Sequence, residues 1–367
     1  DKTFVALDLK TGRELWKAPL DVPTNAGIGI APIAYDGLVY LSTAPVNSSS
    51  EYAGGVIGTL YALDQATGAI VWSFATVKDA NLWGNPAINS GGGAWYPPTI
   101  DELRSVMYWG IGNPAPYPGT SDFPLGSSRP GPNLYTDSVV SLSLTRGDLH
   151  WYYQERPHDL FDLDFQNPPI PLTIRAHGRE RSLVIGSGKT GTVVALDPDR
   201  GGKVVWRTSV GKHQNDTLDN FSDAGVEVYP GALGGLDTPL AYADGTLYAP
   251  VVDWASTYLP TQAEGLEQTA TGELVAIAAS DGSVRWKVDL TAPPFASVTV
   301  VNDVLFTATL DGVVHAFDRA DGSELWHYQA PSSINAPITV VGDRVLIPAG
   351  LGAAPVLIAL QLSDSSH

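Results

Sequence analysis

A short pattern of apolar and polar positions recurs along the chain. In Val5–Trp16, small or branched apolar residues precede an Asp, a polar turn ends in Gly, and a Trp follows four residues later. With small departures the pattern occurs six times, and its tryptophans are Trp16, Trp72, Trp151, Trp206, Trp286 and Trp326. A partial seventh copy, Leu357–Leu360, has no Trp after it. Each copy is typical of a β-hairpin whose second strand ends on the Trp.

Two further strands precede most of these hairpins. Pro32–Tyr35 and Leu38–Tyr40, for example, are apolar segments separated by the turn residues Asp36 and Gly37. Four antiparallel strands per repeat predict an all-β propeller, in which each Trp packs between adjacent blades. Helical periodicity is almost absent. We therefore expect residues 1–367 to form one propeller domain.

The two ends of the chain differ from the other repeats. Residues 1–18 supply only the outer hairpin of a blade, and Asn335–Leu362 supply three strands without a fourth. Seven blades can be counted, with the first and last incomplete, and we expect N-terminal strands to be missing from this chain. Two long insertions, Pro114–Asn133 and Gly211–Gly235, interrupt the repeats and are expected on one face, often the binding face of a repeat protein.

Composition excludes several classes of function. Lys and Arg number 21 against 39 Asp and Glu, a net charge of −18, which disfavours nucleic acid or an anionic membrane surface as a partner. The chain has no Cys, so disulfides, thiolate metal sites and a covalently attached haem are excluded. No apolar run is long enough for a membrane span. The start at Asp1, without Met or a signal peptide, suggests a mature or trimmed form.

Asp162 and Lys189 are the main candidates for chemistry. They flank predicted strands and should lie near the same end of the propeller. A buried Asp beside a cation can take a proton from an alcohol. The alternative is an ordinary salt bridge between two blades. The oxygens of Glu51, Asn113 and Asp162 would suit Ca²⁺ or a larger hard cation.

Three further features leave alternatives open. Asp164 lies two residues after Asp162, on the same side of an extended strand, and either adds a fourth metal ligand or faces solvent. Trp95 follows a run of Gly and Ala and is either a stacking platform for a flat cofactor or a core residue. Gly186–Thr190 resembles a phosphate loop, but a strand instead of a helix should follow it, so we reject that interpretation. The seven His residues show no zinc-site spacing.

Several motifs in combination resemble the pyrroloquinoline quinone (PQQ) dependent alcohol and sugar dehydrogenases. Besides the hairpin repeats, they are Gly91–Trp95, Tyr108–Pro116, Arg129–Gly131 and Pro157–Asp162. The resemblance covers nearly the whole chain and implies an eight-bladed propeller. It also implies PQQ and Ca²⁺, or a lanthanide, as cofactors.

The resemblance assigns roles to individual residues. Asp162 corresponds to the catalytic base and Trp95 to the indole under the quinone plane, while Lys189 corresponds to the basic residue at the quinone oxygens. Asn113 corresponds to a metal ligand beside the cofactor. The full ligand set implied is Glu51, Asn113 and Asp162, with Asp164 as a possible fourth.

The chain also departs from the family pattern. The adjacent cysteines that cover the quinone in many members are absent, so residues near Gly27–Ile30 would have to replace them. Pro132 stands where the family commonly has an acidic residue.

Two functions follow from these observations. The first is an exported dehydrogenase, periplasmic or extracellular, that oxidises an alcohol or sugar and passes electrons to a separate acceptor such as a cytochrome c or a quinone. The second is a quinone-free propeller that binds other proteins, like the outer-membrane assembly lipoproteins that share these repeats. Such a scaffold needs the blades but not Trp95, Asn113, Asp162 and Lys189 together, so their joint presence favours the enzyme.

Overall fold

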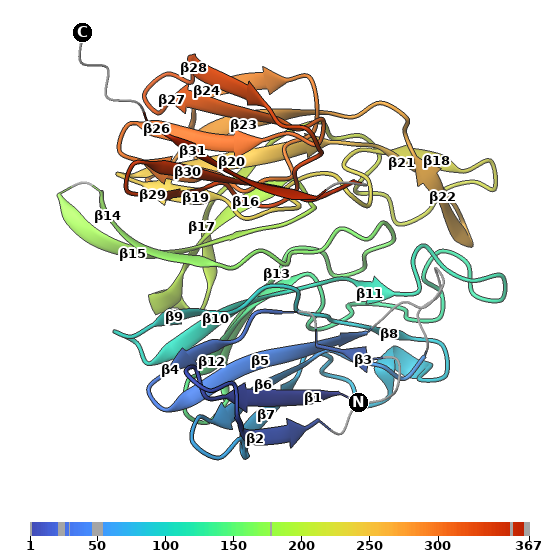
Figure 1. The fold of residues 1–367 in the computed structure, drawn as a ribbon. Helices are drawn as coiled ribbons and strands as arrows, with labels where there is room; N and C mark the ends of the chain where they lie inside the picture. Colours follow the sequence, from blue (N-terminus) through green and yellow to red (C-terminus); the bar gives the residue numbers. More distant parts are fainter. Residues whose placement is uncertain are drawn as a thin grey trace, which may run out of the picture.

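The computed structural model describes residues 2–20, 26–28, 30–45, 54–176, 178–352 and 355–362, and within them it is an all-β propeller (Figure 1). Five blades contain four long antiparallel strands each, and in the first of these the short strand β3 (Ala26–Gly27) also pairs with β5. In chain order they comprise β4 (Ile33–Tyr35), β5 (Leu38–Pro45), β6 (Thr59–Asp64) and β7 (Ile70–Ala75); β9 (Thr99–Asp101), β10 (Val106–Ile111), β12 (Ser138–Ser143) and β13 (Leu149–Gln154); β14 (Ile170–Ala176), β15 (Arg179–Ser187), β16 (Thr192–Asp197) and β17 (Lys203–Ser209); β19 (Ala241–Ala243), β20 (Thr246–Asp253), β23 (Thr271–Ala278) and β24 (Val284–Leu290); and β25 (Thr299–Val301), β26 (Val304–Ala308), β27 (Val313–Asp318) and β28 (Glu324–Gln329).

The first and last blades are incomplete within the described residues, as predicted. The first is the hairpin β1 (Thr3–Leu7) and β2 (Glu14–Pro19), and the last is the three-stranded sheet β29 (Thr339–Val341), β30 (Arg344–Ala349) and β31 (Val356–Gln361). Short elements lie in the segments between blades or between strands of one blade. Between blades they are β3 (Ala26–Gly27), β8 (Ser90–Gly91), β18 (Val226–Val228) and the 3-10 turn η1 (Leu82–Gly84); within a blade they are β11 (Pro114–Ala115), β21 (Ser256–Leu259), β22 (Gln262–Leu266) and the 3-10 turn η2 (Pro198–Arg200).

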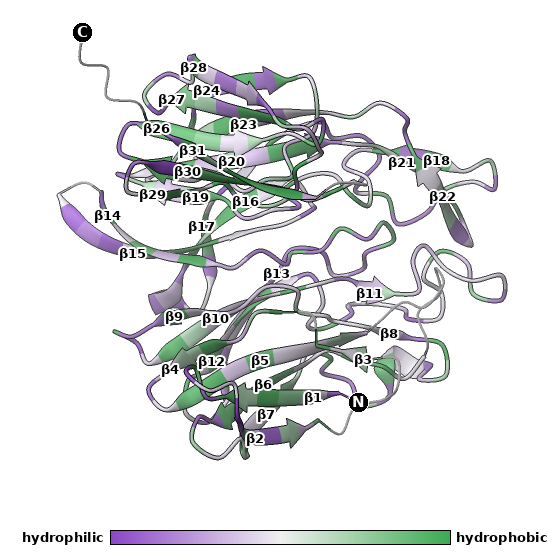
Figure 2. Cartoon of the chain, viewed as in Figure 1, coloured by the Kyte–Doolittle hydropathy of each residue, from purple (hydrophilic) through white to green (hydrophobic). Residues whose placement is uncertain are grey.

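Burial differs between the inner and outer strands of a blade. Every residue of β10 and β12 is buried, because both faces of these strands pack against neighbouring sheets. The outer strand β24 instead alternates exposed and partly buried residues. Figure 2 shows the corresponding hydropathy, with apolar colours along β5, β10 and β20 and polar colours at the tip of the β14–β15 hairpin. The core therefore lies between the blades.

Five of the repeat tryptophans pack as predicted. Each indole lies against the turn glycine of the next blade, which has a φ of +70° to +78°, and a Cβ on that glycine would lie 2.4–2.7 Å from the ring. The pairs are Trp16 with Gly68, Trp72 with Gly147, Trp151 with Gly202, Trp206 with Gly282, and Trp286 with Gly322. The Asp/Gly turn therefore closes its own hairpin and also provides the surface on which the Trp of the preceding blade packs.

The prediction is wrong for Trp326. Its side chain is 40% exposed, and it stacks on Tyr328 of its own strand with ring centroids 6.0 Å apart. The next sheet, β29–β31, has three strands in the described part of the chain, so it lacks the hairpin turn on which an indole would dock. The sequence pattern identifies a Trp that could dock, but it does not show whether the following blade has the turn glycine on which that Trp would pack.

The connecting segments gather on one face of the propeller. In Figure 1, β8, β11, β18, β21 and β22 all lie at the same end of the blades, on the right of the view. Both insertions contribute to this face, and each contains one short strand, β11 or β18, that the sequence did not predict. No helix in the described residues is long and apolar enough to cross a membrane.

Candidate active site

Asp162 and Lys189, predicted to lie near the same end of the propeller, are in contact. Asp162 belongs to the loop between β13 and β14, and Lys189 belongs to the turn between β15 and β16. The Lys189 Nζ lies 3.0 Å from Asp162 Oδ2 and 2.5 Å from Asp164 Oδ2. β16 follows the lysine turn directly, which agrees with the rejection of a phosphate loop. One ammonium therefore joins two carboxylates.

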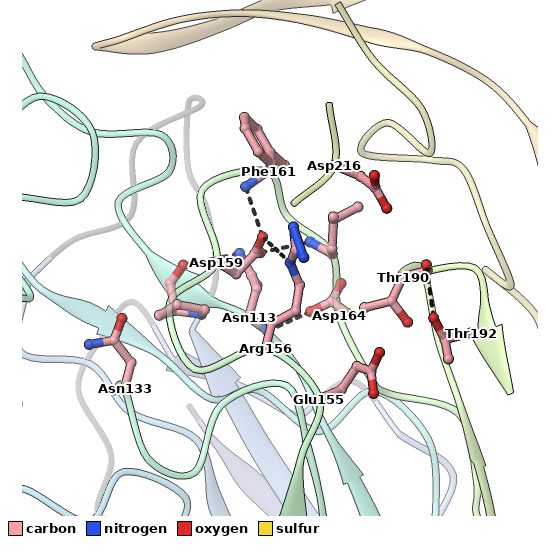
Figure 3. Close-up of polar contacts among 12 residues, drawn as sticks. Asn113, Asn133, Glu155, Arg156, Asp159, Phe161, Asp164, Thr190, Thr192 and Asp216 are labelled. Carbon is pink, nitrogen blue, oxygen red and sulfur yellow. Dashed lines mark hydrogen bonds and ion pairs between the residues drawn. The ribbon is translucent and has the colours of Figure 1, made fainter. Parts of the chain in front are cut away.

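Asp164 faces the site, but not for the reason given by the sequence. Asp162 has a φ of +60°, so the segment is not the extended strand that would put alternate residues on one side. Both carboxylates nevertheless reach Lys189. Asp164 Oδ1 also accepts a hydrogen bond of 2.7 Å from the backbone N–H of Asn113, visible in Figure 3. Asp164 is 3% exposed, so the solvent-facing alternative is wrong.

Asp159 holds the loop that carries Asp162. Its fully buried carboxylate accepts hydrogen bonds from the backbone N–H groups of Phe161, at 2.9 Å, and Leu163, at 2.7 Å. These bonds close a tight turn around the intervening Asp162. Arg156 Nε lies 3.7 Å from the same carboxylate, as Figure 3 shows. The left-handed conformation at Asp162 is thus fixed by its neighbours.

Arg129 ties the first insertion to this loop. Its fully buried guanidinium donates to the carbonyl oxygens of Pro116 and Asp159 and, at 2.7 Å, to Asn133 Oδ1. Burial lowers the pKa of Arg129 to about 10, which still leaves it charged at neutral pH. Arg129 therefore stabilises the loop that carries Asp162, and no residue of the Arg129–Gly131 motif lines the cavity described below.

Trp95 lines a cavity instead of filling the core. A Cβ on Gly112 would lie 2.9 Å from the indole Nε1 and 2.4 Å from Asp164 Oδ1, and one on Gly93 would lie 2.9 Å from the same ring. Only glycine at these positions lets the backbone pass so close to the indole. Of the two alternatives for Trp95, this geometry favours the platform.

The cavity has a volume of about 400 Å³. Its walls are Trp95, Tyr96, Asp162, Asp164, Gln166, Lys189 and Asp237. The sequence analysis missed Tyr96, Gln166 and Asp237. Tyr96 adjoins Trp95, and Gln166 follows Asp164 by two residues in the sequence, so both carried a weak signal. Asp237, in the loop after the second insertion, carried none.

The charged groups of the cavity perturb one another. Burial raises the pKa of Asp162 well above its usual range, and the Lys189 ammonium opposes this shift. Burial also works against the charge on Lys189, but Asp162 and Asp164 outweigh it and raise the pKa of the amine. A carboxylate with a raised pKa is a stronger base, and a perturbed pair in a cavity is typical of functional sites.

The described part of the proposed metal site contains Asn113, Asp162 and Asp164. Asn113 is 3% exposed, and its amide nitrogen donates to the Pro114 carbonyl at 3.2 Å. Glu51 lies outside the described residues. Among those that are described, no group of three or more His, Cys, Asp or Glu side chains could hold a metal ion. The carboxylate and amide oxygens present are nonetheless the donor types that hard cations prefer.

Comparisons with known proteins identify the fold family. Residues 28–209 match the model described as the glucose/ethanol/alcohol dehydrogenase β-propeller domain, and residues 189–364 match that of the outer membrane protein assembly factor BamB. The first match contains every described residue of the cavity except Asp237. The chain belongs to the quinoprotein dehydrogenase family. The blades in the second half of the chain thus also resemble those of this assembly factor.

Individual relatives agree with this assignment. A quinoprotein alcohol dehydrogenase of Pseudomonas putida is 26% identical over 96% of this chain and 68% of its own length. A polyvinylalcohol dehydrogenase of a Sphingopyxis species is 27% identical over 97% of this chain and 55% of its own. A europium-containing methanol dehydrogenase has the same fold, with a TM-score of 0.77 and 21% identity over 96% of this chain and 70% of its own. The chain spans about 55 to 70% of the length of these proteins.

Proposed function

We propose that this chain is a PQQ-dependent dehydrogenase that oxidises an alcohol or sugar hydroxyl. The observation that carries the proposal is the cavity in which the buried pair Asp162–Lys189 faces the indole of Trp95. PQQ is a flat quinone that bears carboxylate groups. An indole between close-approaching glycines and a buried ammonium fit such a molecule, because one offers a stacking face and the other a positive charge.

PQQ, when bound beside a Lewis-acidic cation, supplies the hydride acceptor. The residues of this chain would accept the substrate proton and position the reacting groups. Asp162 accepts the proton of the substrate hydroxyl, since it is buried and its basicity is raised. Lys189, 3.0 Å away, orients the carboxylate and stabilises its charge before the proton is taken. Asp159 and Arg129 keep the Asp162 loop in position. Trp95 would stack against the quinone ring and fix the orientation of its plane.

We extend the proposal to the metal and to the cellular context. The cation would be Ca²⁺ or a lanthanide, held by Glu51, Asn113 and Asp162 with Asp164 as a fourth ligand. The oxygen-only donor set supports a hard cation. Electrons would pass to a separate acceptor, such as a cytochrome c or a quinone, and the protein would work in the periplasm or outside the cell.

Reconstitution tests the proposal. The purified protein should bind PQQ in the presence of Ca²⁺ or La³⁺, with a change in the quinone absorption spectrum and quenching of tryptophan fluorescence. It should then reduce a dye with a panel of primary, secondary and sugar alcohols. If no PQQ binds with either cation, the dehydrogenase proposal fails and the scaffold function takes its place. Omitting the cation is the control, and it should abolish turnover.

Replacing Asp164 by Ala tests the fourth metal ligand. We expect lanthanide-supported turnover to fall while calcium-supported turnover remains, because a lanthanide requires the additional negative charge. Asp164 also accepts the N–H of Asn113, so Asp164→Asn is the matched variant that keeps an acceptor oxygen and removes the charge. Dye reduction with each cation is the measurement. Equal rates in parent and variants with both cations would exclude the ligand role.

A further inference from the structure

Asp237 lies on the wall of the cavity, in a different loop from Asp162. The backbone N–H of Leu236 donates to the Gly188 carbonyl, and Gly235 exchanges two hydrogen bonds of 2.8 Å with Val252. A Cβ on Gly235 would lie 2.1 Å from the Lys189 carbonyl oxygen, so this position requires glycine. The loop is therefore tied directly to the turn that carries Lys189.

Polar side chains fix the peptide of Asp237 itself. Its carbonyl oxygen accepts hydrogen bonds from Gln166 Nε2, at 3.2 Å, and from the Tyr96 hydroxyl, at 3.3 Å. Asn167 holds the carbonyl groups on either side, at 2.9 and 3.2 Å. Three consecutive carbonyl groups thus accept hydrogen bonds, and Asp237 lines the cavity.

The carboxylate of Asp237 differs from the other two in the cavity. Asp162 and Asp164 both contact Lys189, whereas no hydrogen bond or ion pair joins the Asp237 carboxylate to any described residue. The cavity wall thus carries three carboxylates and one ammonium. An anionic ligand that enters meets an excess of negative charge, and Asp237 is the carboxylate that loses least by protonation.

The surroundings of Asp237 favour a proton near neutral pH. Burial raises its pKa to about 6; Lys189 opposes the shift and Asp164 adds to it. The Tyr96 phenol, whose pKa is raised to about 12 by burial, stays neutral. Asp162, Asp164, Lys189 and Tyr96 are the titratable groups that share the cavity with Asp237.

We infer that Asp237 takes up a proton when the carboxylate-bearing quinone enters the cavity, so that cofactor binding is coupled to pH. The inference rests on the proposed function and goes beyond it by assigning a proton-linked role to a residue outside the proposed catalytic set. Protonation removes one negative charge from the wall and turns a repelling acceptor into a hydrogen-bond donor.

The coupling has a calculable size. If only the protonated form binds, the apparent dissociation constant is the intrinsic one divided by the protonated fraction. With a pKa of about 6, PQQ should bind about 30-fold more weakly at pH 7.5 than at pH 5. Binding at pH 7.5 should also take up about one proton per cofactor.

Asp237→Asn tests this coupling because the amide is neutral and of the same size. PQQ binding is measured by quenching of tryptophan fluorescence between pH 5 and 7.5 at a fixed Ca²⁺ concentration. Proton uptake is measured by titration calorimetry in buffers of different ionisation enthalpy. The variant should bind at pH 7.5 about as tightly as the parent binds at pH 5, with no proton taken up. Asp303→Asn, whose side chain is 90% exposed, is the control for net charge and should behave like the parent.

The outcomes separate this inference from the proposed function. If PQQ binds but Asp237→Asn keeps the pH dependence and the proton uptake of the parent, the inference alone is wrong. If the parent binds no PQQ at any pH, both fall. A melting curve provides a readout without cofactor. Because the pKa of Asp237 is raised on folding, its favourable contribution is lost as the pH rises towards 6. The Asn variant should therefore gain melting temperature relative to the parent between pH 4 and 6, and a constant difference would count against the inference.

Discussion

Asp162→Asn is expected to bind PQQ and to lose turnover by about 10²- to 10⁴-fold, the usual cost of removing a general base. The substitution keeps the size of the side chain and one oxygen, which can still accept the hydrogen bond from Lys189 Nζ. It removes the oxygen that accepts the substrate proton. Dye reduction after reconstitution with PQQ and metal measures turnover, and tryptophan fluorescence measures binding.

Two further variants make this result specific to Asp162. Asp289→Asn changes the same functional group on the outer strand β24, where the side chain is 82% exposed, and should turn over like the parent. Lys189→Ala should weaken PQQ binding instead, because it removes the ammonium and leaves Asp162 and Asp164 unpaired. A fully active Asp162→Asn variant that binds PQQ would contradict the role of Asp162 as the acceptor of the substrate proton.

The propeller could be predicted because its determinants are local. The Asp, turn Gly and Trp of each repeat, such as Asp64, Gly68 and Trp72, indicate where its hairpin begins, turns and ends. These residues contact one another within one repeat or between consecutive repeats. The exposure of the Trp326 side chain could not be predicted in this way. Whether an indole is covered depends on the following blade, and the pattern around Trp326 is the same with or without a docking turn.

The candidate site was predictable only in part. Asp162 and Lys189 follow from the resemblance and from their places beside strands, and their contact confirms the placement. The reason why Asp164 also faces the cavity is the turn at Asp162, set by hydrogen bonds to Asp159, which no alternation rule contains. Asp237 was missed because its position depends on bonds between distant loops. Glu51 lies outside the described residues and stays a prediction.

Trp206→Ala is expected to lower the free energy of unfolding by about 3 to 5 kcal/mol, as a large truncation in a core. Trp206 is 9% exposed, packs on Gly282 of the next blade, and donates its indole N–H to the Ala279 carbonyl at 3.1 Å. Truncation opens a cavity between two blades and leaves that carbonyl without its donor.

Trp326→Ala is the matched control for that prediction, because Trp326 occupies the same position in its own repeat. Its side chain is 40% exposed and docks on no turn glycine in the described residues, so the loss should stay below about 2 kcal/mol, within the range of ordinary substitutions. Urea unfolding, followed by tryptophan fluorescence and circular dichroism, gives both values. Equal destabilisation by the two variants would show that the indoles contribute within their own sheets, and the account of blade docking through Trp and Gly would be wrong.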